Sequence, residues 1–133
     1  HDMDTSAVGD PVGLVSGINK IYFEADKDAV ARLCAAADKV GARTLCGTIA
    51  SGDQFLADGA RKRFIADTFS AIACEMEGAA VAQVAYVNRT PFAVMRAISD
   101  SASGDVTMEY PEFLAMAAAK SHAILDAFLA AED

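Results

Sequence analysis

The sequence has few of the residues that hold metal ions in proteins. It contains two histidines and three cysteines among 133 residues, and it has neither a CxxC motif nor a Cys/His cluster. Because metal sites need several such ligands, His1 and His122 indicate no metal centre. The odd number and wide spacing of Cys34, Cys46 and Cys74 predict free thiols in a reducing cytoplasm.

Positive charge is also scarce. Lys and Arg number 11 against 19 Asp and Glu, which gives a formal net charge of -8. Nucleic acids and anionic membranes both require a cationic face, so neither is expected as the main partner. The one basic cluster, residues 61–63, is better explained as the solvated face of a helix. No apolar run is long enough to span a bilayer, and no secretory h-region opens the chain, which favours a soluble, cytoplasmic protein.

Apolar residues make up 53% of the chain, and their pattern alternates between strand-like and helix-like. Apolar runs that fit buried strands cover residues 44–50, 71–74 and 92–98, and shorter extended pieces cover 12–18 and 21–23. Helical spacing covers residues 27–40, after an Asp26 cap and before a Gly41 stop, and also 79–87 and 111–128. This alternation predicts an α/β fold with three αβα layers around a mixed, largely parallel sheet.

Polar residues follow the predicted strands, and in such sheets ligands bind beyond the carboxyl ends of the strands. The candidate segments are residues 51–55, 75–77 and 96–100. Glu75 and Glu77 stand where a strand gives way to a helix, and in extended geometry they would share a side. A carboxylate there could accept hydrogen bonds from the vicinal hydroxyls of a ribose, or both residues could be capping and surface acids.

Arg96 and Asp100 form the next candidate pair. Arg96 lies within an apolar run, so we expect its guanidinium to pair with Glu75 or Glu77. Partial burial at the strand end would raise the pKa of Asp100 and suit it to donate a proton, whereas a structural ion pair with a capping Asp explains the residues equally well. Phe55 could be a stacking platform for a planar base, although a Phe after a turn is more often part of a core.

Five stretches, taken in order, carry a resemblance to a known family. They are HDMDTSAVG, GTIASGDQF, ACEMEGAAVAQVA, PFAVMRAISDSA and YPEFLAMAAAKS, and they extend over nearly the whole chain. In these stretches the sequence resembles the nucleoside phosphorylase/nucleosidase superfamily, particularly its 5'-methylthioadenosine/S-adenosylhomocysteine nucleosidases. The resemblance implies hydrolysis of an N-glycosidic bond, which releases adenine and a 5-thioribose without a metal or organic cofactor.

The resemblance also implies roles for individual residues. Phe55 would stack on adenine and the backbone of Leu56 would hydrogen-bond the base edge. Met76 would pack under the ribose, and Glu77 would hold its hydroxyls. The remaining roles fall later in the chain: Asp100 would protonate purine N7, Ser99 and Arg96 would support it, and Tyr110 would line the 5'-substituent pocket.

The resemblance implies a small purine nucleoside as the ligand, a homodimer, and a place in methionine salvage. Family members have strands, glycine-rich loops and a water-activating Glu upstream of the matched stretches. We therefore expect residues 1–133 to be the C-terminal part of a single domain, and to lack that Glu and be inactive alone. Rival interpretations are a purine nucleoside phosphorylase, a futalosine or other nucleosidase, and a storage or nucleoside-binding protein without catalysis.

Overall fold

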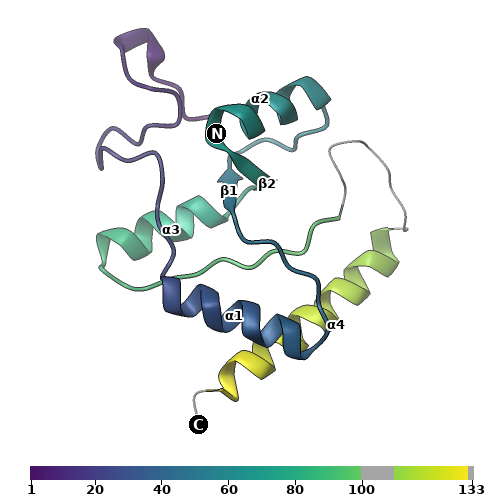
Figure 1. Ribbon diagram of the computed structural model, residues 1–133. Coiled ribbons are helices and arrows are strands. Elements are labelled where there is room, and N and C mark those ends of the chain that lie inside the picture. Colours follow the sequence, from purple (N-terminus) through teal and green to yellow (C-terminus); the bar gives the residue numbers. More distant parts are fainter. Residues whose placement is uncertain (100–109, 132–133) are drawn as a thin grey trace. The chain divides into compact units, whose positions relative to one another are not determined.

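The computed structural model describes residues 1–99 and 110–131 (Figure 1). These residues form two compact units. The first unit combines His1–Glu24 with Gly47–Phe92, and the second combines Ala25–Cys46 with the described residues from Ala93 onward. Both units contain helices, and the first contains a parallel sheet. The predicted α/β class is therefore confirmed.

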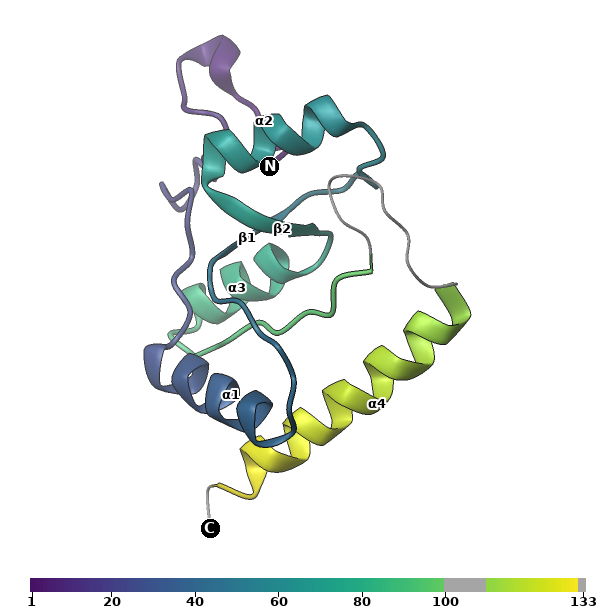
Figure 2. The same ribbon diagram turned by 45° about the vertical axis from the view of Figure 1, so that its right-hand side comes forward.

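The first unit is built on two parallel strands, β1 (Thr48–Ser51) and β2 (Ala71–Glu75). Helix α2 (Gly59–Phe69) connects them, as parallel strands require, and α3 (Gly78–Val87) follows β2. In both views α2 and α3 lie on opposite sides of the strands (Figures 1 and 2). The unit thus has the helix–sheet–helix layering that the sequence predicts.

Helix α2 supplies the core of this unit. Asp58 caps it by accepting hydrogen bonds from the backbone N–H groups of Ala60 and Arg61. Ile65 is fully buried and packs with Phe69 of the same helix and with Ala50 of β1. The basic cluster at residues 61–63 lies on this helix, as its interpretation as a helix face predicts.

Two helices form the second unit, α1 (Lys27–Lys39) and α4 (Tyr110–Leu129). Asp26 caps α1 by accepting a hydrogen bond from the Ala29 N–H at 2.8 Å, as its sequence position predicts. The helices pack through Ala36 and Ala37 of α1 and Ile124 of α4. No helix in the described ranges 1–99 and 110–131 is long and apolar enough to cross a membrane.

Polar and sulfur groups border this helix pair. The Arg32 guanidinium lies over the Phe128 ring, 4.3 Å from its centroid, so a cation–π contact joins α1 to α4. All three cysteines are free, as predicted, and the Sγ atoms of Cys34 and Cys46 lie 2.9 Å apart. This sulfur contact raises the pKa of the Cys34 thiol above its ordinary value.

Several of the predicted strands differ in the structure. Residues 92–98 form no strand, and within the predicted run 44–50 the strand begins only at Thr48. Residues 12–23 contain a single antiparallel bridge between Val15 and Lys20, after a short 3₁₀ helix at Ser6–Val8. An apolar run favours extended backbone, but a strand also needs a neighbour to accept and donate its hydrogen bonds.

We predict that Ile65→Ala lowers the free energy of unfolding by about 2–5 kcal/mol, because it empties a fully buried site. The exposed Thr68 of the same helix provides a matched control. Thr68→Ala should change stability by less than about 0.5 kcal/mol in urea unfolding followed by circular dichroism. Equal effects of the two substitutions would contradict the core assigned to α2.

Candidate functional site

The two strands of the first unit end at the same edge of the sheet. Ser51 at the end of β1 pairs with Glu75 at the end of β2, and the Gly52 N–H donates to the Glu75 carbonyl oxygen at 3.1 Å. The segments that follow both strands therefore leave from one place. One carries Phe55 and Leu56, and the other carries Met76 and Glu77.

Phe55 and Leu56 point to different environments. The Phe55 side chain is 82% exposed, which is unusual for a large apolar group. Leu56 is partly buried against the cluster of Ala50, Ile65 and Phe69. Leu56 thus anchors the loop in the core, whereas the ring of Phe55 is available to a ligand. The alternative that Phe55 is a core residue is wrong for this structure.

Glu75 is the one charged residue that is buried among the described residues, with 8% of its surface exposed. One carboxylate oxygen, Oε2, accepts hydrogen bonds from the N–H groups of Glu77 at 3.0 Å and Gly78 at 2.7 Å. The other, Oε1, accepts from the Ser51 hydroxyl, and the Ser51 Oγ in turn accepts from the Ala79 N–H at 2.8 Å. Glu75 and Ser51 therefore satisfy three N–H groups at the start of α3.

The close approach of Glu75 to α3 depends on a glycine. A Cβ atom at Gly78 would lie 3.0 Å from Oε1 and 3.2 Å from Cδ of Glu75, which is tighter than ordinary contact. A side chain here would force the carboxylate away from the helix N-terminus. The sequence Glu75-Met76-Glu77-Gly78 thus encodes a cap, in addition to any role in binding.

Glu75 and Glu77 do not share a side of the chain, contrary to the sequence-based expectation for extended geometry. Glu75 is buried, whereas Glu77 is exposed and its side chain does not cap α3. The reason is that β2 ends at Glu75, so the two-residue alternation of a strand stops there. Met76, 44% exposed, lies on the same outer segment as Glu77.

Arg96 and Ser99 belong to the second unit, and both side chains are exposed. The expectation that Arg96 is buried in an apolar strand is wrong, because residues 92–98 form no strand. Pairing of Arg96 with Glu75 or Glu77 stays a prediction. Asp100 lies outside the described residues, and Tyr110 is the first residue of α4.

The alternative that Glu75 is a capping acid is confirmed, whereas its burial and the role of Ser51 were missed by sequence reasoning. A signal was present, since the run Glu-Met-Glu-Gly-Ala-Ala places an acid three residues before a glycine at a helix start. An acid in that position can accept the first N–H groups of the helix. In the described part of the chain no group of three His, Cys, Asp or Glu residues is arranged to hold a metal ion.

We predict that Glu75→Ala destabilises the protein by about 1–3 kcal/mol, because two N–H groups of α3 and the Ser51 hydroxyl lose their acceptors. Glu75→Gln retains one acceptor oxygen and should cost less. Urea unfolding gives the free energies, and amide hydrogen exchange at Glu77 and Gly78 localises the effect. Unchanged exchange at both amides in Glu75→Ala would contradict this cap.

Known proteins resemble this chain over nearly its whole length. An aminodeoxyfutalosine nucleosidase from Campylobacter jejuni is 37% identical over 114 residues, which cover 86% of this chain and 49% of the relative. A 5'-methylthioadenosine/S-adenosylhomocysteine nucleosidase from Actinobacillus succinogenes is 39% identical over 122 residues, covering 91% of this chain and 53% of the relative. This chain thus spans about half the length of the curated relatives it matches.

A solved structure agrees with these relatives. It is an Asp-to-Asn mutant of the Helicobacter pylori 5'-methylthioadenosine/S-adenosylhomocysteine nucleosidase, with 5'-methylthioadenosine in the active site. Its TM-score is 0.85 at 36% identity, over 97% of this chain and 55% of the solved chain. The family model described as the phosphorylase superfamily matches residues 1–130. The chain therefore belongs to the phosphorylase superfamily, and the family resemblance seen in its motifs is confirmed.

Proposed function

We propose that this protein is a purine nucleosidase that hydrolyses 5'-methylthioadenosine and S-adenosylhomocysteine, releasing adenine and a 5-thioribose. One observation carries the proposal. The common edge of β1 and β2 presents an exposed aromatic ring, Phe55, and an exposed carboxylate, Glu77, on neighbouring segments. A ring that stacks on a base and a carboxylate that accepts hydrogen bonds from ribose hydroxyls suit the two halves of a nucleoside.

The proposed chemistry depends on a general acid. Adenine leaves poorly until its N7 is protonated, and we assign this proton to Asp100, with Ser99 and Arg96 supporting it. Positive charge then develops on the ribose, as in glycoside hydrolysis, and Glu77 stabilises it electrostatically. Water attacks C1' and completes the cleavage. A solved Helicobacter pylori relative, 36% identical, is an Asp-to-Asn mutant that holds 5'-methylthioadenosine in its active site, which supports 5'-methylthioadenosine as a substrate here.

A second candidate substrate is aminodeoxyfutalosine. The Campylobacter jejuni relative, 37% identical, is named for that activity. Such substrates share the base and ribose and differ at the 5'-group, where Tyr110 is the proposed lining residue. A rate comparison between 5'-methylthioadenosine and aminodeoxyfutalosine decides between them. Release of a ribose 1-phosphate in phosphate buffer would instead identify a phosphorylase.

Further assignments belong to this proposal. We assign residues 1–133 to the C-terminal part of a single nucleosidase domain, because the chain spans about half of its relatives. The working protein is proposed to be a cytoplasmic homodimer that acts in methionine salvage and needs no cofactor. A storage or nucleoside-binding role is the alternative, and it predicts binding without release of adenine.

We predict that Phe55→Ala weakens adenine binding by about 1–3 kcal/mol, the usual contribution of one base–aromatic stacking contact. Its effect on the free energy of unfolding should stay below about 0.5 kcal/mol, because the ring is 82% exposed. Phe64→Ala, which removes a 42% exposed ring from α2, is the matched control and should leave affinity unchanged. Isothermal titration calorimetry with adenine measures both variants, and equal losses would argue against stacking on Phe55.

We predict that Asp100→Asn lowers the rate of adenine release from 5'-methylthioadenosine by about 10²–10⁴-fold, the usual contribution of a general acid. Substrate affinity should change little, because the amide keeps the shape of the carboxyl group. Asp105→Asn, which alters an acid with no assigned role, is the control. The assay uses the full-length protein with detection of free adenine. A storage protein would release no adenine before or after the substitution.

A further inference from the structure

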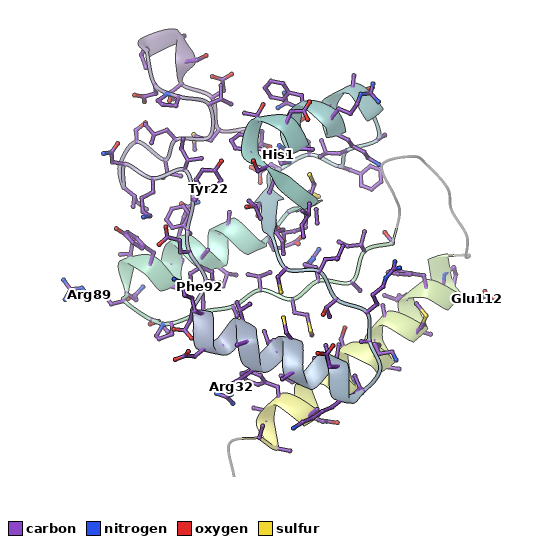
Figure 3. All side chains as sticks on the ribbon, viewed as in Figure 1. His1, Tyr22, Arg32, Arg89, Phe92 and Glu112 are labelled. Atoms are coloured by element: carbon purple, nitrogen blue, oxygen red, sulfur yellow. The ribbon has the colours of Figure 1, made fainter. Side chains whose placement is uncertain are left out.

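The first two residues of the chain lie against the loop that follows β1. Figure 3 shows His1 beside the strands and α2 of the first unit. The His1 backbone nitrogen donates a hydrogen bond to the Ser51 carbonyl oxygen at 2.6 Å. The His1 carbonyl oxygen accepts one from the Arg61 guanidinium of α2 at 3.4 Å. The backbone of His1 therefore joins the end of β1 to the start of α2.

The next residue holds the loop through its side chain. The Asp2 Oδ2 accepts a hydrogen bond from the Asp53 N–H at 2.5 Å. Hydrogen bonds from an N–H group to a carboxylate are among the stronger ones in proteins. Asp53 lies two residues before Phe55, so this bond fixes the backbone from which the exposed ring projects.

Gly52, between these two contacts, is covered by the His1 ring. A Cβ atom at position 52 would lie 2.5 Å from Nε2 of His1 and 2.8 Å from Cγ of Asp2, which real Cβ atoms do not tolerate. Neither ring nitrogen of His1 has a hydrogen-bond partner among the described residues. The ring therefore acts here by packing on the bare backbone of Gly52.

The last residue of β1 and the two residues after it are thus held in three ways: Ser51 by its carbonyl oxygen, Gly52 by packing and Asp53 by its N–H. The far end of the loop is anchored by Leu56 in the core of α2. Between these anchors, the side chains of Gln54 and Phe55 are exposed. A loop fixed at both ends loses little conformational freedom when a ligand stacks on it.

We propose that His1 and Asp2 are positioning residues, which hold residues 51–53 so that Phe55 and the Leu56 backbone are ordered before a planar base binds. This inference rests on the proposed function of the loop as the base site. His1 and Asp2 would then raise the affinity for the base by ordering the loop, without contacting the ligand themselves.

The test compares Asp2→Ala, Asp2→Asn and Asp4→Ala in the full-length protein. Asp2→Ala removes the acceptor for the Asp53 N–H, so exchange of that amide should rise roughly tenfold, as expected for one lost hydrogen bond. Adenine affinity should fall by a similar factor. Asp2→Asn keeps an acceptor oxygen and should restore most of both properties. Asp4 is exposed and accepts from the Ser6 N–H, so Asp4→Ala is the matched control and should change neither.

The readouts are amide hydrogen exchange of residues 50–56 and calorimetric titration with adenine, each with a thermal melt to verify folding. Should Asp2→Ala unfold the chain, Asp2→Asn and Gly52→Ala provide the comparison, since a Cβ at position 52 displaces the His1 ring. Faster exchange in Gly52→Ala, with weaker adenine binding, would support the inference.

The outcomes separate this inference from the proposed function. If the unsubstituted full-length protein does not bind adenine, the loop is not a base site, and both the proposed role of the loop and this inference fall. If it binds adenine and Asp2→Ala binds equally well, the positioning role alone is wrong. If hydrogen exchange of the loop amides is unchanged in Asp2→Ala, His1 and Asp2 do not order the loop, whatever the affinity for adenine.

Discussion

The buried carboxylate of Glu75 lies where β2 ends and α3 begins, and it must be satisfied by hydrogen bonds if it is to stay there. Two N–H groups of α3 and the hydroxyl of Ser51 meet this requirement. Since Ser51 is the last residue of β1, one carboxylate connects both strands and the helix that follows them. The direction in which α3 leaves the sheet depends on this set of contacts.

The same arrangement gives different roles to residues 75–77, one buried in the structure and two on the outside. Glu75 directs its oxygens into the protein, so Met76 and Glu77 are left on the outer segment. On the neighbouring segment, Leu56 enters the core and Phe55 stays outside. Each segment thus anchors one residue and presents another, which gives the edge of the sheet a rigid base and an exposed surface.

Much of this fold could be predicted from local sequence patterns. Asp26 marks the start of α1 and an apolar run marks β2, because capping and strand formation depend on neighbouring residues. The run at 92–98 was misjudged because a strand needs a partner that composition does not reveal. The inward turn of Glu75 was missed because it depends on the Ser51 hydroxyl and the first N–H groups of α3, which only the folded chain brings together.

The contact between His1 and Gly52 joins positions 51 residues apart in the chain. There is no room for a side chain at position 52 while an imidazole covers it. A substitution at one of these positions therefore restricts which residues the other can hold. A relative with alanine or serine at the equivalent of Gly52 would need a smaller residue, or a displaced chain, at the equivalent of His1.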